Sequence, residues 1–100
     1  MSENSLFVFA RIAPKSEHYE DAKNAILSIL QQTRAEPGCR QFELHENVAE
    51  KNLFLYEEWA SEHALEEHYL KPYTSQVFER YKAWLSEPVD VVKMSKCIAS

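Results

Sequence analysis

The segment from Leu53 to Trp59 is apolar except at Glu57 and Glu58, and this restricts the possible folds more than any other part of the sequence. A strand with one wetted face alternates apolar and polar residues, whereas a strand covered on both faces reads as a nearly continuous apolar run. The chain has 100 residues, which is enough for one domain. We therefore expect a single domain over residues 1–100, with its core at about 6–94, in which other parts of the protein cover both faces of this strand.

Strand and helix patterns alternate along the rest of the chain. Runs of β-branched and aromatic residues predict strands, and apolar residues spaced by three and four predict helices. A proline disfavours helical geometry in the residue before it, so Lys71-Pro72 should interrupt the second helical region. The predicted elements are a strand at 6–12, a helix from Ser16 as its N-cap to Pro37, strands at 39–47 and 53–59, a helix from Ser61 that restarts at Pro72 and ends before Pro88, and a strand at 89–94.

This β-α-β-β-α-β order is typical of the ferredoxin-like α+β fold, in which a four-stranded antiparallel sheet carries its helices on one face. The other face would be bare in a monomer, as a larger apolar patch than soluble monomers usually expose. We expect a homodimer in which two sheets face each other and enclose a barrel-like interior, with a pocket between sheet and helices in each subunit. A different partner protein is the alternative.

Composition and charge exclude several kinds of partner. Eleven Lys and Arg stand against sixteen Asp and Glu, a net charge of −5, so the basic footprint that nucleic-acid binding needs is missing. The apolar stretches are too short to span a membrane and the N-terminus is polar, which predicts a cytoplasmic protein without a signal peptide. Cys39 and Cys97 lack disulfide or metal spacing, and His63 and His68 are separated by i, i+5, so no metal site is expected.

Five short segments together resemble the antibiotic biosynthesis monooxygenase family of small dimeric α+β barrel proteins. They are Glu36–Cys39, Phe42–Leu44, Tyr56–Trp59, Ala64–His68 and Lys71–Tyr73, and the likeness extends over about 6–94. The resemblance implies oxygenation of small electron-rich aromatic substrates, such as quinols, by O₂ without a cofactor. Deprotonation makes a quinol electron-rich enough to reduce O₂, so such a protein needs a base of near-neutral pKa in a closed, largely apolar pocket.

His68 matches this requirement best. It lies three residues after Leu65 and one before Tyr69, on or beside the inward face of its predicted helix. It also occupies the position of the family's recurrent histidine, which implies a role as catalytic base. A structural histidine hydrogen-bonded inside the core is the alternative.

Four further residues are candidates for substrate binding. Trp59 could stack on a flat ring, although a buried tryptophan is usually part of a core. Glu57 shares a strand face with Trp59 and would be a second acid or base, or the partner in an ion pair. Tyr73 stands where many relatives have a second histidine, and a phenol is a weak base at neutral pH. Arg80 could neutralise an anionic substrate or lie in solvent.

Three hypotheses for the function follow. The first is a cofactor-independent monooxygenase of the quinol-oxidising type that uses His68. The second is an isomerase of a small hydroxyketone, which needs the same base but no oxygen. The third is a non-catalytic module that binds a small ligand. Leu55 stands where some antibiotic-modifying relatives have asparagine, which weakens a polyketide substrate as the specific choice.

Overall fold

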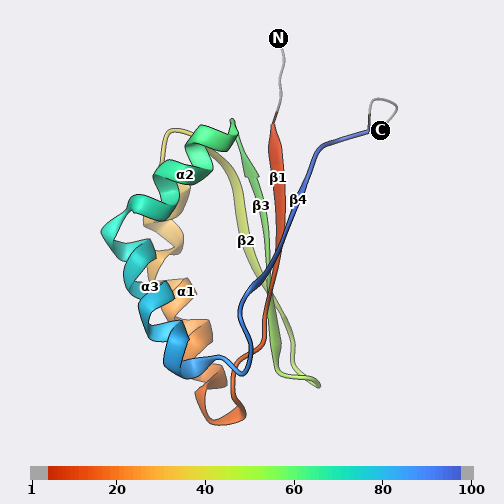
Figure 1. The fold of residues 1–100 in the computed structure, drawn as a ribbon, viewed down its shortest axis with the longest axis vertical. Coiled ribbons are helices and arrows are strands. Elements are labelled where there is room, and N and C mark those ends of the chain that lie inside the picture. The colour runs from red at the N-terminus through yellow and green to blue at the C-terminus, as the bar shows by residue number, and fades with distance from the viewer. Residues whose placement is uncertain (1–4, 98–100) are drawn as a thin grey trace.

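A four-stranded antiparallel sheet forms one layer of the protein, and all helices lie on one of its faces in the computed structural model (Figure 1). The structure describes residues 5–97. The strand order is β2-β3-β1-β4. The elements are β1 (Leu6–Ile12), a 3₁₀ turn η1 (Ser16–His18), α1 (Tyr19–Arg34), β2 (Cys39–Asn47), β3 (Asn52–Trp59), α2 (Glu62–Leu70), α3 (Pro72–Trp84) and β4 (Asp90–Met94). The predicted ferredoxin-like α+β fold is confirmed.

The helix boundaries follow the sequence signals except at the two ends of α1, which ends at Arg34, before the predicted Pro37. The Ser61 hydroxyl accepts a hydrogen bond from the Ala64 N–H at 3.1 Å and caps α2, as predicted. Lys71 has extended geometry before Pro72, which is the first residue of α3. Ser16 does not cap α1, because it lies within the 3₁₀ turn and the helix begins at Tyr19 without a side-chain cap.

The core lies between the sheet and the helices. Alternate residues of β3 are buried on this side, and the third of them is the carboxylic acid Glu57. In β1, Val8, Ala10 and Ile12 point the same way and are buried. From α1, Ile26 and other apolar residues complete the interior. The period of two along the strands therefore places a titratable group inside an apolar layer.

The opposite face of the sheet carries a second apolar surface, which we call the open face. Its aromatic residues are Phe7, Phe9, Phe54 and Tyr56, and the rings of Phe9 and Phe54 stack at 5.6 Å. Phe9 is 39% exposed and its strand neighbour Val92 is 45% exposed. A single chain thus covers β3 on one face only, and the dimer that would cover the other face stays a prediction.

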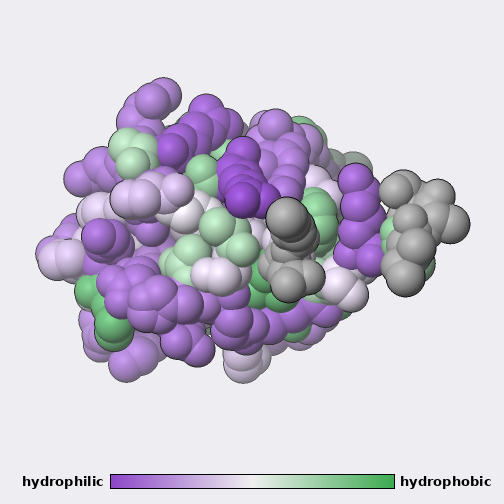
Figure 2. All heavy atoms as spheres, turned by 90° about the horizontal axis from the view of Figure 1, so that it is seen from above, coloured by the Kyte–Doolittle hydropathy of each residue, from purple (hydrophilic) through white to green (hydrophobic). Residues whose placement is uncertain are grey.

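At the end of the molecule that Figure 2 shows from above, hydrophilic residues predominate and hydrophobic residues form small separate groups.

Among residues 5–97, no helix is long and apolar enough to cross a membrane.

Candidate functional site

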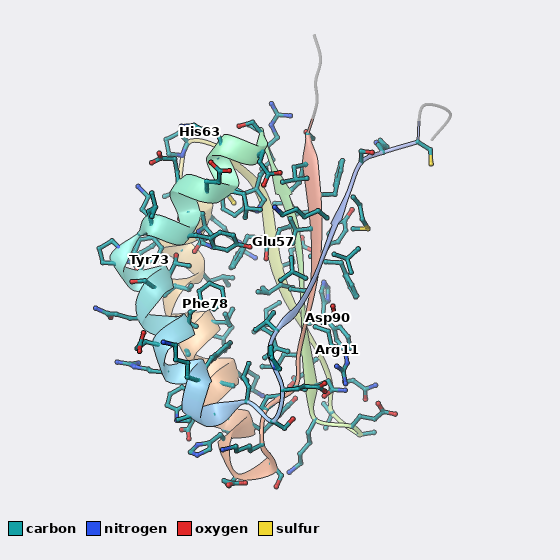
Figure 3. The ribbon with its side chains drawn as sticks, in the orientation of Figure 1. Arg11, Glu57, His63, Tyr73, Phe78 and Asp90 are labelled. Atoms are coloured by element: carbon teal, nitrogen blue, oxygen red, sulfur yellow. The ribbon has the colours of Figure 1, made fainter. Side chains whose placement is uncertain are left out.

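A small cavity of about 30 Å³ lies between the sheet and the helices. Most of its walls are apolar, and all four strands and the helices α1, α2 and α3 contribute to them. Glu57 and His68 are the ionisable groups in this lining that can titrate near neutral pH. Figure 3 shows Glu57 pointing from β3 toward the helices and Phe78 pointing from α3 toward the sheet. Two acid–base groups that meet at an apolar cavity make this the candidate site.

A close approach of α2 to the start of β2 positions His68. The N–H of Ala60 donates to the carbonyl of Gly38 at 2.8 Å, which ties the end of β3 to the turn before β2. A Cβ atom on Gly38 would lie 2.4 Å from the Cβ of Ala64 in α2, so only glycine fits there. The break at Pro72 ends α2 shortly after His68. These contacts hold His68 over β3, where it is 4% exposed.

A hydrogen-bonded triad of Glu36, His68 and Tyr73 fixes the imidazole. His68 Nδ1 lies 2.9 Å from Glu36 Oε2, and the Tyr73 hydroxyl donates to the same oxygen at 2.5 Å. Because that oxygen already accepts from the phenol, Nδ1 is the protonated nitrogen that donates to it. In neutral His68 the lone pair is then on Nε2. Among the described residues, none forms a hydrogen bond with this nitrogen. Nε2 is therefore the nitrogen available to a ligand.

Burial controls the protonation of His68. Removal from water lowers its pKa below the usual 6.5, and the contact with Glu36 opposes this shift in part. The imidazole packs against the Trp59 ring at 4.7 Å and the Phe42 ring at 5.7 Å between centroids. His68 is accordingly neutral at pH 7 and can accept a proton.

Glu57 shows the opposite shift from the same cause. The side chain is 5% exposed, and burial raises its pKa from 4.5 to about 7. The Trp59 indole N–H donates to Glu57 Oε1 at 2.8 Å, which lowers the pKa and limits the rise. Glu57 can thus hold or release a proton close to neutral pH.

The structure brings together only part of the set of residues that the sequence predicted. His68 and Glu57 line the cavity, and Glu57 has no ion-pair partner among residues 5–97. Trp59 is fully buried behind His68 and is not part of the lining. Tyr73 bonds to Glu36 outside the cavity. Arg80 is exposed on α3 and does not line the cavity either. Trp59, Tyr73 and Arg80 therefore do not line this cavity, and their roles in substrate binding stay predictions.

Other site residues were missed by the sequence analysis. Glu36 holds His68, and its position directly before Pro37-Gly38 at the end of a helix gives no sign that it would point inward. Thr74 lies with its hydroxyl 3.5 Å from His68 Nδ1, and Phe78 closes one side of the cavity. No group of three or more His, Cys, Asp or Glu side chains within residues 5–97 is arranged to hold a metal ion.

The protein thus combines a small antiparallel α+β fold with a buried His68–Glu36 pair beside an apolar cavity. A family model described as "Antibiotic biosynthesis monooxygenase" matches residues 5–86, and the chain belongs to this family.

Individual relatives agree with that assignment. "Putative monooxygenase YcnE" of Bacillus subtilis is 35% identical over 85 residues, which are 84% of this chain and 90% of that protein. "Putative monooxygenase Rv0793" of Mycobacterium tuberculosis is 30% identical over 88% of this chain and 87% of its own length. The solved structure of Rv0793 superposes with a TM-score of 0.88, covering 93% of this chain and 95% of that one at 28% identity. The structure of PA3566 from Pseudomonas aeruginosa shows the same fold, with a TM-score of 0.90 and 22% identity over 97% of this chain and 98% of that one.

Proposed function

We propose that this protein is a cofactor-independent monooxygenase that oxidises a small electron-rich aromatic molecule such as a quinol. The observation that carries the proposal is His68, a neutral, buried imidazole whose Nδ1 is fixed by Glu36 and whose Nε2 is left for a ligand. Membership of the family and the names of the two relatives support a monooxygenase-like role. The apolar walls suit an uncharged aromatic ring.

The reaction converts a quinol and O₂ into a hydroxyquinone and water. His68 Nε2 accepts a hydroxyl proton, and the quinol anion passes one electron to O₂, giving a semiquinone radical and superoxide. These combine through a new C–O bond, and the returned proton completes a ring hydroperoxide. Loss of the proton on that carbon breaks the O–O bond, and the hydroxide released takes a proton and leaves as water. The substrate supplies all four electrons, so the balance needs no other reductant.

Glu57 is suited to the last proton transfers. In its protonated form it can donate to the leaving hydroxide, and its pKa of about 7 allows it to be reprotonated at neutral pH. An apolar cavity also keeps water away from the superoxide and the radical until they combine. The two titratable groups in the cavity therefore take separate roles, His68 as the base and Glu57 as the acid.

The protein acts as a homodimer in this proposal. The open face exposes Phe9 and Val92 beside the half-buried rings of Phe54 and Tyr56, and a second copy would cover them. Each cavity lies on the other side of its sheet, so both subunits would keep a complete site.

The test is O₂ uptake by purified, metal-stripped protein with a panel of quinols and phenols, after subtraction of spontaneous oxidation. His68→Ala and His68→Asn should lower kcat by about 10²- to 10⁴-fold, the usual contribution of a general base. His63→Ala on the same helix is the matched control, because that side chain is 78% exposed and faces solvent. Unchanged turnover in both His68 variants would rule out the assigned base.

A hydroxyketone isomerase is the second candidate, and one observation favours it. A base and an acid that line the same cavity can move a proton between neighbouring carbon and oxygen atoms without O₂. Turnover of a hydroxyketone under strict anaerobiosis, with no O₂ uptake on any quinol, would favour this candidate over the oxygenase. Ligand binding without any turnover would instead indicate a binding module.

A further inference from the structure

The cavity beside His68 is too small for the ring of an aromatic substrate. Its volume of about 30 Å³ admits one or two water-sized molecules, or O₂. A cavity that binds benzene has a volume of about 150 Å³. A ring can therefore reach His68 only if a lining side chain moves.

A much larger groove of about 580 Å³ runs along the outside of the same wall. It lies between the C-terminal half of α3 and the segment that leads into β4. Four residues line both the cavity and the groove: Phe78, Tyr81, Val89 and Val91. The two spaces are thus adjacent compartments with a shared wall.

Phe78 is the part of this wall best able to move. Tyr81 is 3% exposed and its hydroxyl donates to the Ala22 carbonyl at 2.7 Å, so it is anchored in the core. Phe78 is 40% exposed, and its ring contacts the Tyr69 ring edge-on at 5.8 Å. Figure 3 shows it pointing from α3 toward the sheet. Rotation of an exposed side chain is fast and costs little packing.

We propose that Phe78 is a gate between the two compartments and that the outer groove binds an apolar substituent of the substrate. With Phe78 turned aside, the ring lies against His68 and a hydrocarbon chain attached to the ring extends into the groove. The choice of a hydrocarbon chain follows from the groove walls, where Leu85, Pro88, Val89 and Val91 supply apolar surface. Lys82 and Glu87 also line the groove, and Glu87 pairs with Arg11 at 3.2 Å. The identity of the ring rests on the proposed function, whereas the groove is a separate claim.

The first experiment measures binding by calorimetry for a series of 4-alkylphenols, from methyl to hexyl. Phenols of this kind bind without needing turnover. Each added CH₂ should tighten binding by about two- to fourfold until the groove is filled, since full burial of one CH₂ corresponds to about fourfold. Val91→Thr places a hydroxyl on the groove wall and should flatten this dependence. Val92→Thr is the matched control: it is the next residue of β4, is similarly exposed, and points to the open face.

The second experiment tests the gate with phenol and the bulkier 2-naphthol. Phe78→Ala should improve the affinity for 2-naphthol relative to phenol by about tenfold or more, because the open state no longer has to compete with a closed one. Phe78→Trp should have the opposite effect. Leu27→Ala, at an apolar α1 residue that is 47% exposed and outside both compartments, should leave the ratio unchanged.

The outcomes separate this inference from the proposed function. Binding that does not depend on chain length, or equal slopes for Val91→Thr and Val92→Thr, would overturn the groove but not the oxygenase. An unchanged naphthol-to-phenol ratio in both Phe78 variants would overturn the gate. Chain-dependent binding without O₂ uptake on the corresponding alkylquinols would support the groove and contradict the oxygenase. No binding by any phenol would overturn the groove and the gate, whereas the oxygenase is decided by O₂ uptake on the quinol panel.

Discussion

Replacement of Glu57 by glutamine should remove a pH-dependent contribution from the stability of the protein. The size of that contribution measures the pKa of Glu57 in the folded state. Glu57 is buried and lines the same cavity as His68, and its pKa rises from 4.5 to about 7 because burial penalises the charged form. Between these pH values the folded protein holds a proton that the unfolded chain has lost. The stability of the wild-type protein therefore falls as the pH rises through this window. Glutamine cannot ionise, and its amide oxygen can still accept the Trp59 N–H.

The magnitude follows from the pKa difference. One pKa unit corresponds to about 1.4 kcal/mol, so a rise from 4.5 to about 7 amounts to about 3 kcal/mol in the free energy of unfolding. From pH 5 to pH 8, which covers most of this window, Glu57→Gln should gain about 2.5 kcal/mol relative to the wild type. The lowered pKa of His68 has the opposite sign, because stability is lost as the pH falls below the ordinary value of 6.5. That contribution is common to both proteins and cancels in their difference.

The assay is urea unfolding of both proteins at a series of pH values between 5 and 8, at one fixed protein concentration. Glu66→Gln is the control, since Glu66 is exposed on α2 and should give a flat difference. A difference between Glu57→Gln and wild type that stays constant within about 0.5 kcal/mol would refute the reasoning. It would mean that Glu57 is solvated enough in solution to keep an ordinary pKa.

Three further perturbations test the contacts that build the site. Gly38→Ala should destabilise the protein by about 1–3 kcal/mol, because its Cβ would overlap that of Ala64, and thermal unfolding would show the loss. Glu36→Gln should lower kcat more than it raises KM, and should shift the acid limb of the kcat/KM profile to lower pH as His68 loses the contact that raises its pKa; an unchanged profile would contradict this role. Phe9→Asp on the open face should give a monomer in sedimentation experiments, and a variant that sediments like the wild type would argue against pairing through this face.

The sequence predicts the strands and helices well because each carries a local signal. The near-continuous apolar run of β3 and the break at Pro72 arise from residues close together in the chain. The order of these elements along the chain then predicts the ferredoxin-like fold, and the structure arranges the strands as β2-β3-β1-β4. The missed detail at Ser16 is also local, because a 3₁₀ turn and the first turn of an α-helix have similar residue preferences.

The site was predicted only in part because its contacts are long-range. His68 and Glu57 could be found from helix and strand periodicity, which shows the face on which each residue lies. Glu36 lies 32 residues before His68, and no local pattern indicates that the two side chains meet. The exposure of Arg80 likewise depends on the orientation of α3 relative to the sheet, which no local sequence pattern indicates.

Burial shifts the pKa values of Glu57 and His68 in opposite directions, and this affects whether the cavity prefers a neutral or a charged ligand. Burial raises the pKa of Glu57 and lowers that of His68, so near pH 7 the cavity favours an uncharged acid beside an uncharged base. No lysine or arginine lines it among the described residues, since Arg80 is exposed on α3. An anionic ligand would enter without a cation to balance it, and would pay a large desolvation penalty. A neutral phenol should therefore bind much more tightly than the same ring bearing a carboxylate, and calorimetry at pH 7 would show a reversed preference if charge pairing governed the site.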